Sequence, residues 1–73
     1  MPHLSPVSRK DFIKILHKFG FIGPYPGGNH SFMLKNKIRL ILPNPHSKEV
    51  GVALLHNLLK QADINVEEWN QSK

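Results

Sequence analysis

The sequence contains no cysteine. Disulfide bonds, thiol nucleophiles and cysteine-based metal clusters are therefore excluded. With 73 residues and no such covalent support, the chain forms one small domain that is held together by apolar packing among a few helices and strands. A domain of this size also favours support from a partner chain.

Long apolar runs are missing as well. No run approaches the roughly 18 residues that a membrane span needs, and residues 1–6 lack the charged segment and apolar core of a secretory signal. The sequence contains no internal repeat, low-complexity tract or linker. We therefore expect a cytoplasmic protein with a tail at residues 1–7 and a single domain at residues 8–70.

Acidic residues are scarce. Five Asp and Glu stand against ten Lys and Arg, which gives a formal net charge of +5 and an isoelectric point near 9.9. A basic balance of this kind is typical of proteins that bind the phosphates of nucleic acids, although it also serves simply to keep a small protein soluble. The charge favours a nucleic-acid partner over that second interpretation.

The segment after the tail predicts a helix. Ser8 can cap it, because its hydroxyl can accept the backbone N–H of Asp11. Apolar side chains then recur at helical spacing, at Phe12, Leu16 and Phe19. Gly20 supplies the left-handed position that ends many helices.

The middle of the chain predicts strands. Residues 21–28 are rich in proline and glycine, which indicates a short edge strand followed by a loop that contains Tyr25. Residues 30–35 and 38–42 then predict a tight hairpin across the turn Asn36-Lys37. In this register three pairs face each other: Phe32 and Ile41, Met33 and Leu40, and Leu34 and Arg39.

The two faces of this hairpin differ. The core face carries Met33, Ile38, Leu40 and Leu42. The other face carries His30, Phe32, Leu34, Arg39 and Ile41. A slip of one residue would exchange the two faces. Exposed apolar side chains on the second face are a poor surface for a free monomer, so we expect a partner to cover it.

A second helix follows the prolines at positions 43 and 45. Ser47 can cap it, and apolar residues recur at helical spacing, at Val50, Leu54, Leu55, Leu58, Leu59 and Ala62. Asp63 tolerates the left-handed position at its end. Asn65 and Glu68 can cap a final helical turn, whose Trp69 packs on the body. The order α-β-β-β-α predicts an α+β fold in which helices cover one face of a three-stranded antiparallel sheet.

His30 is the leading candidate for chemistry. It lies between the glycine-rich turn Gly27-Gly28-Asn29 and a buried strand, and histidine exchanges protons near neutral pH without special tuning. The other interpretation is a hydrogen-bonded structural histidine at the start of a strand. The remaining histidines on helices and in the tail show no spacing that converges on a metal, so we expect no metal and no cofactor.

RNA is a fitting substrate for such a histidine, because its own 2′-hydroxyl can act as the nucleophile and no metal is needed. As a general base or acid, His30 would raise the rate of cleavage, typically by about 10²- to 10⁴-fold. His46 is the best candidate for a second proton-transfer group, although it could equally fix its loop. We assign the RNA contacts to Gly28, Asn29, Lys35, Lys37, Arg39, His46 and Lys48.

Four segments together resemble a known family. They are Phe19-Gly20-Phe21, Gly28-Asn29-His30, the strand exit Leu42-Pro43-Asn44-Pro45-His46, and Leu58-Leu59-Lys60-Gln61-Ala62-Asp63-Ile64. In this order, and over nearly the whole chain, they look like the HicA toxins of bacterial toxin-antitoxin modules. The family usually has Gly-Ser-His followed by a second histidine, where this chain has Asn29 and Ser31, and a glycine where it has Asp63.

The resemblance implies a domain similar to double-stranded-RNA-binding domains. It also implies a metal-independent mRNA interferase whose catalytic residue is His30 and which a HicB-type antitoxin neutralises, with that antitoxin covering the partly apolar sheet face. Two alternatives stay open: a non-catalytic RNA-binding module of the same fold, and a protein-interaction domain whose positive charge is incidental.

Overall fold

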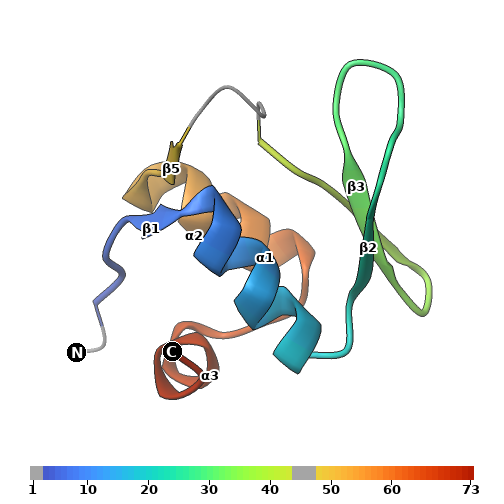
Figure 1. Cartoon of the computed structure of the whole chain (residues 1–73). Helices are drawn as coiled ribbons and strands as arrows, with labels where there is room; N and C mark the ends of the chain where they lie inside the picture. The colour runs from blue at the N-terminus through green and yellow to red at the C-terminus, as the bar shows by residue number, and fades with distance from the viewer. Residues whose placement is uncertain (1–2, 44–47) are drawn as a thin grey trace.

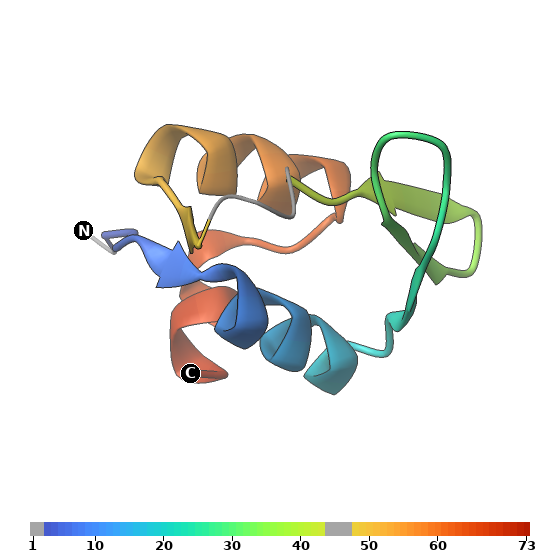
Figure 2. The ribbon, with the colours of Figure 1, turned by 45° about the horizontal axis from the view of Figure 1, so that its top comes forward.

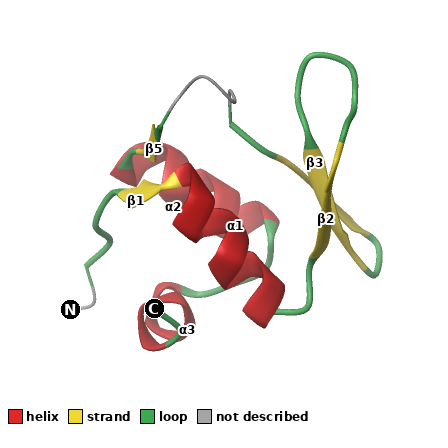
Figure 3. Ribbon diagram, in the orientation of Figure 1, coloured by secondary structure: helices red, strands yellow, loops and turns green. Residues whose placement is uncertain are grey.

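The computed structural model describes residues 3–43 and 48–73 and has an α+β architecture (Figure 1). Along the chain the elements are β1 (Val7–Ser8), α1 (Arg9–Lys18), β2 (Ile22–Tyr25), β3 (Phe32–Lys35), β4 (Ile38–Ile41), β5 (Glu49–Val50), α2 (Val52–Gln61) and α3 (Val66–Gln71). Strands β2, β3 and β4 form an antiparallel sheet with β3 in the middle. The predicted fold class is confirmed, with the helices and the three-stranded sheet side by side in Figure 3.

Helix α1 begins and ends as predicted. The Ser8 hydroxyl accepts the backbone N–H of Asp11 at 3.0 Å. At the other end Gly20 has φ +92°, its N–H reaches the carbonyl of His17 at 3.1 Å, and the next N–H reaches the carbonyl of Leu16 at 3.1 Å. These two bonds form a Schellman motif, which satisfies carbonyls that the helix end would leave unpaired.

The hairpin of β3 and β4 has the predicted register, with Phe32 opposite Ile41, Met33 opposite Leu40 and Leu34 opposite Arg39. Its two-residue turn places Asn36 at φ +52°, a conformation that asparagine tolerates better than most residues. Strand β2 pairs with β3 on the other side, so the predicted edge strand is confirmed. Tyr25, expected in the loop, is instead the last residue of β2 and pairs with Phe32.

A second, two-stranded ladder was not predicted. Strands β1 and β5 pair antiparallel, with Val7 opposite Val50, and the Arg9 N–H extends the ladder to the Lys48 carbonyl at 3.0 Å. Val7, the last residue of the predicted tail, is buried in this contact. Each strand leads directly into a helix, so the ladder joins the N-terminal ends of α1 and α2, as Figure 2 shows.

The predicted start of the second helix is wrong. Val50 belongs to β5, and α2 begins at Val52 with Gly51 as its N-cap. Ser47, the expected cap, lies outside the described residues. Val50 is nevertheless fully buried, because pairing with Val7 gives it the core contact that the helical spacing assigned to a helix face.

The end of α2 and the start of α3 follow the sequence. Asp63 has φ +59°, its N–H reaches Lys60 O at 3.3 Å, and the following N–H reaches Leu59 O at 2.9 Å, which repeats the Schellman motif of α1. Asn65 then caps α3: its Oδ1 accepts the Glu68 N–H at 2.7 Å and its Nδ2 donates to Glu68 Oε1 at 2.7 Å.

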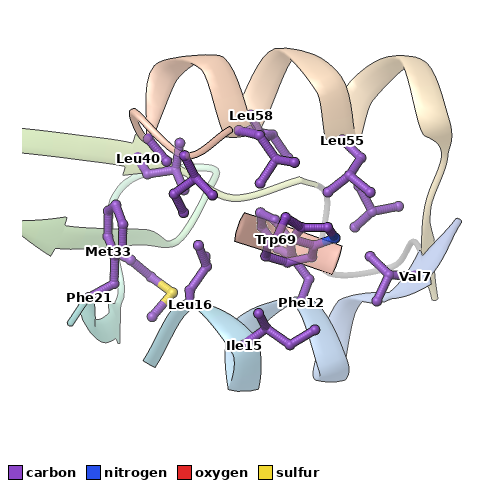
Figure 4. Close-up of a cluster of buried hydrophobic side chains, with 14 of the residues drawn as sticks. Val7, Phe12, Ile15, Leu16, Phe21, Met33, Leu40, Leu55, Leu58 and Trp69 are labelled. Carbon is purple, nitrogen blue, oxygen red and sulfur yellow. The ribbon is translucent and has the colours of Figure 1, made fainter. Parts of the chain in front are cut away.

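The core lies between α1 and α2 and is closed at one end by the sheet (Figure 2). Met33 and Leu40 reach it from the sheet, in Figure 4, and both are fully buried. Trp69 of α3 is also fully buried, with its ring 5.5 Å from that of Phe12 and 6.4 Å from that of Phe19. The sheet therefore has a helix face, which holds Met33, Ile38, Leu40 and Leu42 as predicted.

The opposite face of the sheet has no covering element in the described part of the chain. We call it the open face; it consists of Ile22, Tyr25, Phe32, Leu34, Arg39 and Ile41. Three of these residues are large apolar side chains with substantial exposure: Ile22 at 54%, Tyr25 at 40% and Ile41 at 44%. The candidate catalytic residue lies at one end of this sheet.

Candidate active site

His30 lies in a tight turn just before β3. Its backbone N–H donates to the carbonyl of Gly27 at 2.9 Å, which closes the turn, and Gly28 within the turn has φ +49°. The ladder begins one residue later, where the Ser31 carbonyl accepts the N–H of Leu42 at 2.9 Å. The prediction that His30 is part of the strand is therefore wrong: its N–H is already used by the turn.

The imidazole of His30 is exposed. Among the described residues it makes no hydrogen bond and no ion pair. A histidine with a structural role would need such a bond, so within this part of the chain that interpretation has no support. An exposed ring with both nitrogens available is free to meet a substrate.

The two glycines of the turn serve different purposes. A Cβ atom on Gly27 would lie 2.8 Å from the Phe32 ring, closer than real Cβ contacts allow. A Cβ on Gly28 would meet nothing within 4 Å, but the positive φ of this residue favours glycine. Gly27 thus permits a close approach between the turn and the sheet, and Gly28 permits the sharp turn itself.

Three side chains on the open face, one from each strand, form what we call the stacking row. The rings of Tyr25 and Phe32 lie 5.7 Å apart at an interplanar angle of 36°. The guanidinium carbon of Arg39 lies 4.4 Å from the centroid of the Phe32 ring. Gly27 contacts the same ring, so the turn that carries His30 and the stacking row form one continuous surface.

Sequence reasoning did not assign Tyr25 to this site. The flanking prolines at positions 24 and 26 indicated a loop. Strand β2 accommodates Pro24 because it is an edge strand, where a missing N–H costs least, and because its register with β3 shifts between Ile22 and Tyr25. Pro26 follows the end of the strand. The sequence did contain one signal for this role: Tyr25 is an aromatic residue at the C-terminal end of the edge strand, just before the turn that leads to His30.

The predicted basic residues do not gather around His30. Lys35 lies at the far end of β3 on the helix face, with its Nζ 5.7 Å from the centroid of the Phe21 ring. At about 3.3 Å per residue of extended chain, Lys35 lies about 10 Å along β3 from Phe32, and His30 lies beyond the Phe32 end of the strand. Lys37 is exposed in the hairpin turn at that same far end. The turn carrying His30 and the hairpin turn project from opposite ends of the sheet (Figure 1).

The remaining predicted contacts fall into two groups. Gly28 and Asn29 are exposed in the turn beside His30, and Arg39 is the cation that the stacking row brings toward that turn. Lys48 is exposed next to β5, at the ladder that joins the helices rather than at the sheet. His46 lies outside the described residues.

Two further findings concern sites of other kinds. Within residues 3–43 and 48–73, no three side chains of histidine, aspartate or glutamate lie close enough together to hold a metal ion. Over the same residues, none of the helices has the length and apolar character to cross a lipid bilayer.

Comparison with known proteins gives one match. The family model described as the HicA toxin of bacterial toxin-antitoxin modules matches residues 9–64. This range begins at the first residue of α1 and includes the sheet, the His30 turn and α2. Neither the curated proteins nor the solved structures gave a significant match, so the likeness to double-stranded-RNA-binding domains stays a prediction.

Proposed function

The chain belongs to the HicA family of toxins of bacterial toxin-antitoxin modules, and from this premise we propose that it is an endoribonuclease that cleaves mRNA through His30. The observation that carries the proposal is the position of this residue. Its exposed imidazole stands in a tight turn beside an apolar sheet face that includes a cation, and no described residue occupies either ring nitrogen.

The proposed reaction uses groups that RNA and the protein already hold. A neutral His30 nitrogen takes the proton of a ribose 2′-hydroxyl, and the oxygen forms a bond to the adjacent phosphorus. The bond from phosphorus to the 5′-oxygen breaks, and that oxygen takes up a proton from water. The products are a 2′,3′-cyclic phosphate and a 5′-hydroxyl, and no metal is required.

Arg39 is the residue best situated to stabilise the charge that accumulates on the phosphoryl oxygens. It shares the Phe32 ring with the turn of His30, and no carboxylate lies within ion-pair distance of it among the described residues. Lys37 stands at the other end of the hairpin, so it would meet a phosphate further along the strand.

We further propose that a HicB-type antitoxin neutralises the toxin in the cytoplasm by covering the open face and the His30 turn. Exposed Ile22, Tyr25 and Ile41 supply an apolar centre for such an interface. The net charge of +5 favours an acidic partner segment. RNA access to His30 would then be blocked by steric occlusion.

The test compares three proteins purified without antitoxin: the unaltered chain, His30→Ala and His56→Ala. His56 is exposed on α2 and serves as the matched control. Each is incubated with single-stranded RNA in excess EDTA, after circular dichroism has shown an unchanged fold. We expect the unaltered chain and His56→Ala to cleave, and His30→Ala to be inactive.

Two outcomes contradict the proposal. Undiminished cleavage by His30→Ala removes this residue from the chemistry, and cleavage that occurs with added Mg²⁺ but not in EDTA removes the metal-independent mechanism. If none of the three proteins cleaves but all bind RNA with an affinity that falls as salt rises, the chain is a non-catalytic RNA-binding module of this fold.

A further inference from the structure

The stacking row presents its groups in two layers. Phe32 is half-buried, with Gly27 at its edge and the Arg39 guanidinium over its ring. Tyr25 is 40% exposed and Arg39 is also exposed. Phe32 therefore acts as the support that orients its two neighbours, and the outward surface consists of a phenol ring and a planar cation.

Such a surface suits an unpaired base. Bases that are splayed out of a single strand stack on aromatic rings and on guanidinium planes, whereas bases inside a duplex are covered by their neighbours. A cation beside an aromatic ring also meets the phosphate that follows the base.

The charge of the open face agrees with this occupant. Arg39 is the single charged residue among the six that form the face, and no carboxylate lies within ion-pair distance of it in the described part of the chain. A polyanion therefore meets no acidic side chain belonging to this face.

The row is also close to the candidate catalytic residue. Phe32 follows His30 by two residues, so their Cα atoms are at most about 7 Å apart. The ring also contacts Gly27 of the turn that His30 closes. A base stacked on this row thus holds its ribose and the adjoining phosphate beside the imidazole.

We propose that Tyr25, Phe32 and Arg39 form a stacking platform for one unpaired base next to the cleaved bond, so that the substrate is single-stranded RNA. This inference rests on the proposed nuclease function for the identity of the cleaved bond. Tyr25 supplies the stacking surface, Arg39 contacts the base or its phosphate, and Phe32 fixes the position of both.

The test uses the full chain carrying His30→Ala, so that RNA is not consumed. Its ligand is a short single-stranded oligoribonucleotide with one 2-aminopurine, a base whose fluorescence is quenched when it stacks. In this background we expect binding with quenching. Tyr25→Leu, which keeps apolar bulk but removes the ring, should weaken binding by about 5- to 100-fold and abolish the quenching.

Further variants separate stacking from charge and from fold. Arg39→Lys keeps the charge but loses the planar group, so it should also weaken binding. Tyr25→Phe keeps the ring and should keep the quenching. Ile22→Ala is the matched control, because Ile22 is exposed on the open face but lies outside the row. Circular dichroism of each variant confirms that the fold is intact.

The inference is overturned if Tyr25→Leu binds and quenches like its parent, or if a duplex of the same sequence binds as tightly as the single strand. It is equally overturned if the Tyr25 and Arg39 variants lose affinity only for the cognate antitoxin, because the face is then a protein interface. The cleavage assay separates the two proposals. Cleavage without a Tyr25 effect refutes the platform alone, and Tyr25-dependent quenching without cleavage by the unaltered chain refutes the nuclease alone.

Discussion

Gly27 lies so close to Phe32 that a Cβ atom on the glycine would stand 2.8 Å from Cδ1 and 2.9 Å from Cε1 of the ring. The turn that carries His30 and the centre of the open face are therefore positioned by the same contact. Any side chain at Gly27 must push the turn and the ring apart.

The first prediction follows from this contact. Gly27→Ala should lower the free energy of unfolding by about 1–3 kcal/mol, the usual cost of overpacking, and should reduce RNA cleavage because His30 moves relative to Arg39. Urea denaturation and the cleavage assay measure the two effects. Gly28→Asn is the control for the unfolding measurement, since that position has a positive φ and no neighbour within 4 Å of an added Cβ; an equal loss of stability in both variants would refute the role of the contact.

The second prediction concerns Asp63, which holds the left-handed position after α2 at φ +59°. Glycine adopts this conformation without the steric penalty of a Cβ, so Asp63→Gly should raise the free energy of unfolding by about 0.5–1 kcal/mol. Asp63→Ala should lower it. RNA cleavage should stay the same in both, because Asp63 lies at the end of α2 rather than at the sheet. Stabilisation by alanine would contradict the backbone argument.

The third prediction concerns His17 on α1. Its Nε2 lies 2.8 Å from the carbonyl of Gly23 and, as an N–H, donates to it, which ties α1 to the start of β2. His17→Ala should destabilise the fold by about 1 kcal/mol, the net value of a typical hydrogen bond. His56→Ala, the same change at another exposed helical histidine, should shift the urea midpoint much less. If the two variants behave alike, the bond contributes nothing measurable.

The fourth prediction separates two of the cations of the hairpin, Lys35 and Arg39. Each phosphate contact contributes about 0.7 to the slope of log affinity against log salt for a single strand. Arg39→Gln should therefore reduce the slope by about 0.7. Lys35→Gln should change it little, because Lys35 lies on the helix face over Phe21. A larger slope change for Lys35 than for Arg39 would show that RNA binds the helix face of the sheet and not the open face, which would contradict the prediction.

The parts of the fold that local chemistry determines were predicted from the sequence. Ser8 caps a helix, Gly20 ends it, and the alternation of side chains in each strand turns Met33 and Leu40 toward the core. Each of these features depends on nearby residues in the chain, so the sequence alone is enough to recognise it. The hairpin register followed from a two-residue turn and was correct in every pair. The sequence also placed His30 directly after the glycine-rich turn, and the structure closes that turn with the His30 N–H.

Two of the errors came from pairing between separate segments, and the third came from local competition for one backbone N–H. Val50 has the spacing of a helical core residue, and only its pairing with Val7 makes it a strand residue. Tyr25 follows a proline, and only the register of β2 against β3 places it beside Phe32. His30 fell outside the ladder because its N–H bonds to Gly27, a competition that alternation of side chains does not reveal.

The position of Trp69 determines how late in its synthesis the toxin can finish folding. This residue is fully buried in α3, yet its ring lies against Phe12 of α1 and against Phe19, the C-cap of that helix. During synthesis α1 leaves the ribosome long before α3. The nascent polypeptide therefore cannot complete its interior until α3 has also emerged, so a chain that carries only α1, the sheet and α2 has no fully packed core.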